Sequence, residues 1–525
     1  MNEGLFSERP VQRLGPVEEE ALLERLSAER PRTVLVVSDL HLSYGRDPAT
    51  ARYPRTENFL ADDAFARWLD ACAPDAAGAL LVLNGDTFDF LRICTVPGTE
   101  RELAGWAQGL ARLGVTPAPT AAQLRGAIDR KERRFGLGTE DFKSVWKLWQ
   151  IAAGHGPFFD ALGRWVARGG RVLLVKGNHD VELYWPLVRL AVREILAARA
   201  GGAGSAELVA GAVAFADTHL RIANLHLEHG HQYEPPTRVL GGPVLDDHPS
   251  QLRLPLGSFV NRYLINPAEQ VEPFLDNVRP VQRYIVMLLR RHPLQALGML
   301  ERAWPFIVRS LKTPAKLDAF GITLFLVSLL LPLAVLAAAA VLGVQVLLGR
   351  RELASLFAGW KPWLGALGML APYLLSAGRE LLASLRKPRV AEDDFADHAY
   401  AALRELPAPR ARVLYAVYGH THDQDTQALP PIQGTPVLYL NTGTWTPLFI
   451  EDRPDLLGRA FRPFLRFTRG EAGEYTHEYL EWSDDRGAPV AATILGPDPR
   501  SQRTHPAPAG AGEEDAQGVT TGVGV

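Results

Sequence analysis

Residues 33–41 read Thr-Val-Leu-Val-Val-Ser-Asp-Leu-His, and this stretch decides the fold. Its first five residues are apolar or β-branched, which is typical of a buried strand, and the strand delivers Asp39 and His41 into the loop that follows. Residues 79–86 (ALLVLNGD) repeat the arrangement and also end in an aspartate. Between the two runs, residues 61–73 carry apolar side chains at helical spacing. The order strand, helix, strand predicts an α/β fold with a parallel sheet.

Three further apolar runs precede polar side chains that are able to bind a metal. They are residues 171–176, residues 220–228, which we expect to form one alternating strand, and residues 412–418. In open α/β sheets, sites assemble at the carboxyl ends of the strands. The candidate metal ligands that follow the five runs are Asp39, His41, Asp86, Asn178, His229, His420 and His422.

These ligand types suit the hydrolysis of a phosphate ester by two divalent metal ions. Such chemistry uses cations about 3.5 to 4 Å apart, which neutralise charge on the phosphoryl oxygens and turn water into a nucleophile at neutral pH. A carboxylate has to bridge the two ions, and Asp86 is the candidate. A ligand set of oxygen and imidazole nitrogen without thiolate favours Mn, with Fe or Zn as alternatives, over Ca.

The motifs resemble those of the calcineurin-like metallophosphoesterase superfamily, whose pattern is D-x-H, G-D-x-x-D, G-N-H-D or E, H, and G-H-x-H. The chain contains all five in this order. The resemblance implies a four-layer α/β/β/α sandwich of two stacked sheets, with a metal-bridging hydroxide as nucleophile. It also implies that His179, oriented by Asp89, stabilises the phosphoryl charge or protonates the leaving oxygen. It assigns one ion to Asp39, His41, Asp86 and His422, and the other to Asp86, Asn178, His229 and His420.

Other polar residues near these motifs have alternative interpretations. His231 could replace His229 as a ligand, but the resemblance places the ligand before the glycine. His226 lies on the alternating run and is expected to pack or to support a ligand. Asn441 and Thr444 follow the apolar run 436–440 and are expected to brace the last strand or the ligands.

The substrate is expected to contain a phosphodiester, pyrophosphate or phosphomonoester bond. Residues 38–42, 85–89 and 229–232 resemble the bacterial UDP-2,3-diacylglucosamine pyrophosphatases most in detail, although that family typically has Arg where this chain has His179. The expected partners are a phosphate ester, including lipid-linked ones, and membrane lipid, but no specific nucleic acid. Two alternatives are a membrane-anchored nuclease or nucleotide phosphodiesterase, and a non-enzymatic membrane scaffold.

A long apolar block separates the last two groups of candidate ligands. Residues 319–349 contain no charged side chain, and this run of 31 residues is long enough for a transmembrane helix. Residues 353–378 form a second, weaker candidate for a transmembrane helix. If ligands before and after the apolar block share one site, the chain has to cross the membrane an even number of times. Basic residues concentrate on both flanks, so we expect a helical hairpin in the cell membrane with the catalytic domain on the cytoplasmic side. The alternative is a buried helical core with a basic, solvated face.

Composition and length complete the expected organisation. The chain has 525 residues and a formal net charge of -3, which gives no general attraction to nucleic acid. Its only cysteines, Cys72 and Cys94, exclude a disulfide scaffold. The expected parts are an N-terminal extension (1–31), a first catalytic part (32–240) with a helical insertion (91–170), membrane-associated helices (265–390), a second catalytic part (410–482) and a disordered tail (497–525).

Overall fold

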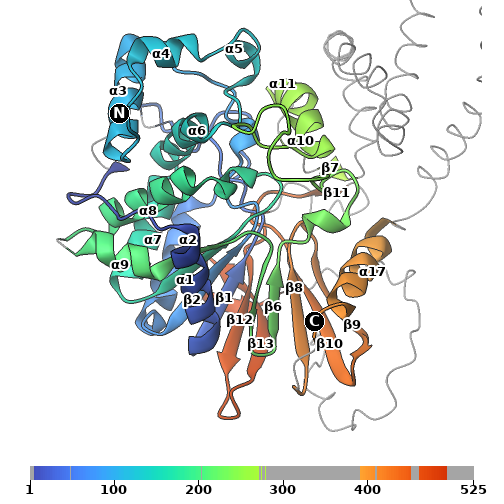
Figure 1. The fold of residues 1–525 in the computed structure, drawn as a ribbon. Coiled ribbons are helices and arrows are strands. Elements are labelled where there is room, and N and C mark those ends of the chain that lie inside the picture. Colours follow the sequence, from blue (N-terminus) through green and yellow to red (C-terminus); the bar gives the residue numbers. More distant parts are fainter. Residues whose placement is uncertain are drawn as a thin grey trace, which may run out of the picture.

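The computed structural model describes residues 5–270 except 48 and 203, residue 274, and residues 278–279, 391–407, 411–450 and 460–492. These residues form a mixed α/β fold with two main sheets (Figure 1). The first sheet has the order β14 (Ala488–Ala491), β13 (Tyr475–Ser483), β12 (Pro463–Arg469), β1 (Thr33–Val37), β2 (Ala79–Asn84), β3 (Arg171–Val175) and β4 (Val213–Ala216). The second has the order β5 (His219–Ile222), β6 (Leu225–Glu228), β8 (Leu414–Tyr418), β10 (Thr435–Thr442) and β9 (Gln424–Ile432). A short pair joins β11 (Phe449–Ile450) to β7 (Val278–Arg279).

The centre of the first sheet is parallel, as the apolar runs predict. Strands β1, β2, β3 and β4 pair in parallel in that order, and β12 adds antiparallel to β1. All six residues of β2 are buried, which is the pattern of a strand covered on both faces. The carboxyl ends of β1, β2 and β3 therefore meet at one edge of the sheet.

The second sheet corrects one sequence prediction. Residues 220–228 do not form one strand, because β5 and β6 pair antiparallel as a hairpin with Ile222 opposite Leu225. Ala223 has a φ of 50°, and the side chain of Asn224 binds the backbone of Val413 and Tyr475. The spacing of the apolar residues changes from two positions to three between Ile222 and Leu225, which is where the chain turns.

The chain forms four layers, which are visible in Figure 1. A core of mostly aliphatic side chains from β1, β2, β3, β6, β8 and β12 separates the two sheets. On the outer face of the first sheet pack α2 (Asp62–Cys72), α6 (Asp141–Gly154), α7 (Gly156–Ala167), α8 (Pro186–Ala200) and α9 (Ser205–Ala212). On the outer face of the second sheet packs α17 (Ala391–Arg404), through Phe395, Ala399 and Leu403.

The segment between β2 and β3 is mostly helical, as expected of the insertion. It contains α3 (Glu100–Arg112), α4 (Ala121–Gly126) and α5 (Glu132–Phe135) in addition to α6 and α7. The indole rings of Trp106, Trp146 and Trp149 are buried in its core. Two short helices after β6, α10 (Leu256–Val260) and α11 (Asn266–Glu269), lie against this segment, since Arg262 between them donates to the carbonyl of Leu137 at 2.7 Å.

Helix α1 (Pro16–Glu29), in the N-terminal segment 1–31, packs against the rest of the fold. It inserts Leu22 and Leu26 into the core between the sheets. The guanidinium of Arg193 on α8 makes a bidentate ion pair with Glu19, at 2.6 and 2.8 Å. Both side chains are buried, so this pair fixes α1 against the helical layer.

The predicted membrane hairpin at 319–349 and 353–378 and the predicted tail at 497–525 lie outside the described residues. Within the described part of the chain, no helix combines the length and the apolar character needed to cross a membrane.

Candidate metal centre

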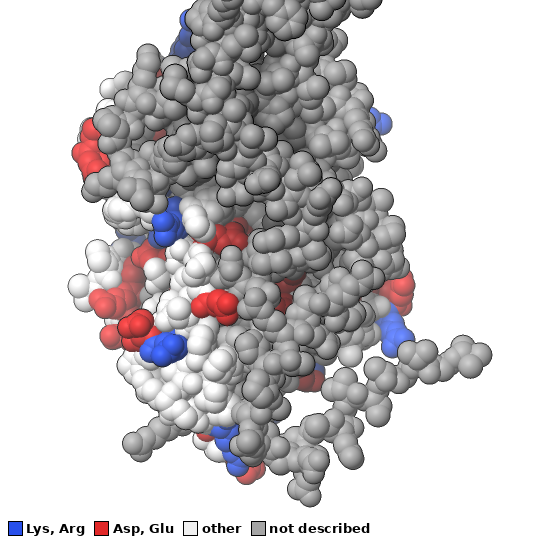
Figure 2. All heavy atoms as spheres, turned by 90° about the vertical axis from the view of Figure 1, so that its right-hand side faces the viewer, with Lys and Arg blue, Asp and Glu red and all other residues white. Residues whose placement is uncertain are grey.

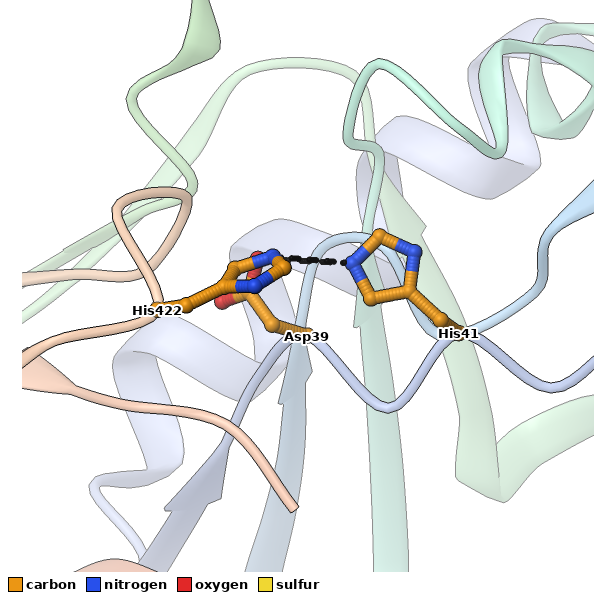
Figure 3. A group of neighbouring side chains, drawn as sticks. All are labelled: Asp39, His41 and His422. Atoms are coloured by element: carbon orange, nitrogen blue, oxygen red, sulfur yellow. Dashed lines mark hydrogen bonds and ion pairs between the residues drawn. The ribbon is translucent and has the colours of Figure 1, made fainter. Parts of the chain in front are cut away.

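The loops after β1 and β8 bring Asp39, His41 and His422 together. Nε2 of His41 lies 3.0 Å from Nε2 of His422, and Nε2 of His422 lies 3.4 Å from Oδ1 of Asp39. Figure 3 shows the two imidazole rings pointing toward each other, with the Asp39 carboxylate beside the ring of His422. All three side chains are buried. Because one ligand atom of each lies within 4.8 Å of the others, this group is able to hold a metal ion.

Asp86 stands between this group and a second one. Its Oδ2 lies 3.9 Å from Nε2 of His41 and 3.3 Å from Nε2 of His229. His420 completes the second group with Asp86 and His229, and the rings of the two histidines are 5.3 Å apart. Asp86 thus lies between His41 of the first group and the two histidines of the second.

Asn178 lies in the turn after β3, and both of its neighbours touch Asp86. The backbone nitrogen of His179 donates to Oδ1 of Asp86 at 2.8 Å, and a Cβ on Gly177 would lie 2.1 Å from the same oxygen. The amide oxygen Oδ1 of Asn178 is buried and has no hydrogen-bond partner among the described residues. A buried polar atom without a partner is costly, so this oxygen is suited to a cation.

The backbone is strained at five of the seven predicted ligands. Asp39, His41, Asp86, His420 and His422 have φ values between 49° and 73°. Only ten non-glycine residues of the described chain have a positive φ, and half of them are these ligands. Such conformations cost about 1 to 3 kcal/mol each and cluster at functional sites. The fold therefore holds these side chains in place against a local preference.

His179 and Asp89 form a pair beside the metal ligands. Nδ1 of His179 lies 2.9 Å from Oδ2 of Asp89, and Nδ1 of His41 lies 3.4 Å from the same oxygen. The Asp89 carboxylate is fully buried, whereas His179 is partly exposed. This is the arrangement that the resemblance implies. His179 also falls in a potential metal group with His41 and Asp86, so the structure places it at the edge of the cluster and not outside it.

Four residues that hold the site together were not assigned from sequence. The carboxylate of Asp180 accepts from the backbone nitrogens of Gly177 at 2.6 Å and Thr87 at 2.9 Å, which ties two ligand loops together. Its position after His179 in the motif was a usable signal.

The other three of these residues had no comparable signal. Nε2 of His420 lies 3.0 Å from Glu234 and 3.2 Å from Thr237. Arg92 donates to Oδ2 of Asp89 at 2.9 Å. For Arg92, the only signal in the sequence is its position three residues after Asp89. No sequence pattern indicates Glu234 or Thr237.

The carboxylates and imidazoles of the site shift one another's pKa values toward the charged forms. Burial alone would raise the pKa of Asp39, but His229 and His422 lower it to about 2. The pKa of Asp86 likewise lies well below its usual range because His229 and His179 outweigh its burial. Burial would lower the pKa of His229, yet Asp86 and Asp39 raise it to about 9. The carboxylates that attract a proton to this imidazole would equally attract a metal cation.

The remaining candidates fall into supporting positions. The structure places His229, and not His231, in the group with Asp86. His226 pairs with Glu228 at 2.8 Å and is buried, which fits a packing role. Asn441 donates to the carbonyl of Gly419 at 2.7 Å, and Thr444 donates to the carbonyl of Asp39 at 2.6 Å. Both therefore brace ligand loops, as the sequence predicted.

The residues present fit a metal centre. Buried carboxylate oxygens, imidazole nitrogens and one amide oxygen converge without a thiolate, the donor set that suits Mn, Fe or Zn. Comparison of the chain with protein-family models and with curated proteins found no match.

Proposed function

We propose that this protein is a metal-dependent phosphoesterase with the four-layer sandwich of the calcineurin-like metallophosphoesterases. The observation that carries the proposal is the position of Asp86, whose carboxylate lies near His41 after a strand of one sheet and groups with His229 and His420 after strands of the other. Asp39, His41, Asp86 and His422 would hold one cation, and Asp86, Asn178, His229 and His420 the other. Bound in this way, two cations would neutralise the phosphoryl charge and lower the pKa of a water molecule.

The charge of the site explains why a phosphate ester requires cations here. Asp39, Asp86 and Asp89 are buried and have pKa values below their usual range, so all three are ionised at neutral pH. An anionic phosphate would be repelled by three carboxylates in a region of low dielectric. Metal binding reverses this repulsion, and that favours an anionic substrate over a neutral one.

We assign to His179 the role of contacting the substrate directly. Asp89 engages its Nδ1, which fixes the orientation of the ring and favours the protonated state at that nitrogen. Nε2 is then the atom we assign to a phosphoryl oxygen or to the leaving oxygen. The partial exposure of this histidine, in contrast to the buried Asp89, agrees with a role at the surface of the site.

We infer that the substrate is associated with a membrane. The support is the uncharged run at 319–349, which separates the ligand His229 from the ligands His420 and His422 in the sequence. A lipid-linked phosphodiester or pyrophosphate would place its scissile bond beside the bilayer. On the face in Figure 2, the described acidic and basic side chains are interspersed with uncharged ones, so this face offers no extended basic surface for nucleic acid among the described residues.

The test is turnover by the full-length chain in detergent. After treatment with a chelator, the protein is supplied with Mn²⁺ and assayed with bis(p-nitrophenyl) phosphate, a nucleotide phosphodiester and a UDP-linked diacylglucosamine. We expect metal-dependent hydrolysis that is lost in His229→Gln and retained in His248→Gln, a matched change at an exposed histidine. Binding of Mn²⁺ without turnover of any substrate would refute the proposal and favour a scaffold.

A further inference from the structure

A buried ion pair lies behind the His179–Asp89 pair. The guanidinium of Arg92 donates through Nη1 and Nη2 to the carboxylate of Glu269 on α11, and both side chains are fully buried. Nη1 also donates to the carbonyl of Thr56 at 3.1 Å. A guanidinium and a carboxylate 177 positions apart in the chain thus meet inside the protein.

Arg92 also contacts Asp89. Nε of Arg92 donates to Oδ2 of Asp89 at 2.9 Å, and the Arg92 backbone nitrogen donates to Oδ1 at 3.2 Å. The same Oδ2 binds Nδ1 of His179. The guanidinium of Arg92 and the imidazoles of His179 and His41 together set the direction of the Asp89 carboxylate.

Glu269 decides which edge of the guanidinium faces Asp89. Both terminal nitrogens of Arg92 donate to Glu269, whereas Nε donates to Asp89. Arg and carboxylate prefer a bidentate pair, so an Arg92 without Glu269 would turn a second nitrogen toward Asp89. That turn would draw Oδ2 away from His179.

Helix α11 is built to hold Glu269 in this position. Asn266 on the same helix donates to the carbonyl of Leu91 at 2.7 Å, next to Arg92. Asn266 and Glu269 are both buried. The first and last residues of the helix therefore dock it on the segment that carries Asp89.

We propose that Glu269 is a positioning residue, which acts through Arg92 to keep Asp89 aligned with His179. The inference rests on the proposed function and deepens it, because it names a determinant of the reaction outside the metal ligands. Substitution of groups that orient functional side chains in metal sites typically costs about 10- to 100-fold.

The test compares Glu269→Gln with the wild type and with Glu478→Gln, a matched change in an exposed ion pair with Arg466. We expect kcat to fall about 10- to 100-fold in Glu269→Gln with little change in KM, and no change in Glu478→Gln. In a His179→Ala background, Glu269→Gln should cost little more, because a residue that acts through His179 has no further effect once that ring is removed. Additive losses would mean a merely structural role and would overturn the proposal.

A second readout is independent of turnover. In the metal-free chain, the Nδ1 proton of His179 should give a downfield NMR resonance, identified by its absence in His179→Ala. A shifted or lost resonance in Glu269→Gln supports the proposal, and an unchanged one refutes it even if the wild type hydrolyses nothing. Absence of turnover in the wild type would instead refute the proposed function.

A double variant tests the proposal if Glu269→Gln does not fold. Removing one partner of a buried pair is strongly destabilising, whereas replacing both with apolar residues is often tolerated. Arg92→Met/Glu269→Met should therefore fold and still show the loss in kcat and the changed His179 resonance. A folded double variant with wild-type kcat would also overturn the proposal.

Discussion

Replacing Gly177 by alanine tests whether the close approach of two loops sets the position of the shared carboxylate. A Cβ at residue 177 would lie 2.1 Å from Oδ1 of Asp86 and 2.5 Å from its backbone nitrogen. Real Cβ atoms do not approach other atoms closer than about 3.0 Å, so the carboxylate has to move by about 0.9 Å and the backbone by about 0.5 Å. Gly177 has no positive φ, so the effect is steric alone.

The size of this shift determines the expected loss. Functional sites tolerate displacements of about 0.5 Å, and a misplacement of about 1 Å costs on the order of 100-fold in rate. We therefore expect Gly177→Ala to lower kcat with bis(p-nitrophenyl) phosphate about 100-fold. Since we propose Asp86 as a ligand of both cations, the affinity for Mn²⁺, measured by calorimetry, should fall at least about tenfold as well.

A matched glycine provides the control. Gly211 lies in helix α9, and a Cβ there would meet nothing within 4 Å. Gly211→Ala should leave turnover and metal affinity unchanged and raise stability by up to about 1 kcal/mol, because alanine favours a helix. A folded Gly177→Ala variant with turnover and Mn²⁺ affinity within about a factor of two of the wild type would refute the steric reasoning.

Three further predictions follow from the contacts and charges of the described residues. Glu234→Gln should weaken Mn²⁺ binding about 10- to 100-fold in calorimetry, because Glu234 orients His420 through Nε2; an unchanged affinity would exclude that role. The affinity for Mn²⁺ should rise with pH up to about pH 9, where His229 loses its proton, since a ligating imidazole must be neutral; a flat profile of Kd against pH would contradict this. Burial alone would lower the pKa of His155. The carboxylates of Asp62 at 2.9 Å and Glu57 at 3.3 Å outweigh burial and raise this pKa to about 10. The stabilisation of the folded state by protonated His155 is complete below the pKa of about 6.5 in the unfolded chain and is lost as the pH rises through about 10. Between these pH values, the Tm of His155→Gln should therefore fall less than the Tm of the wild type.

The strands of the first sheet could be predicted because their sequences are unambiguous. The runs at 33–37 and 79–84 are continuously apolar and end in polar loops, and each became a buried parallel strand. The hairpin at residues 219–228 left only a weak signal in the sequence, because its turn contains neither glycine nor proline. That signal is the change in spacing of the apolar residues from two positions to three between Ile222 and Leu225. The integration of α1 could not be predicted, because its Glu19 pairs with Arg193 far along the chain.

The sequence by itself determined the kinds of donor atoms at this centre and the strand ends that carry them, because both follow from local composition and from the period of the strand. Tertiary structure decided that Asp86 is shared, that His229 rather than His231 joins it, and that Arg92 meets Glu269. These contacts join residues up to several hundred positions apart, so they depend on how two sheets and their helices pack. No local pattern encodes that packing.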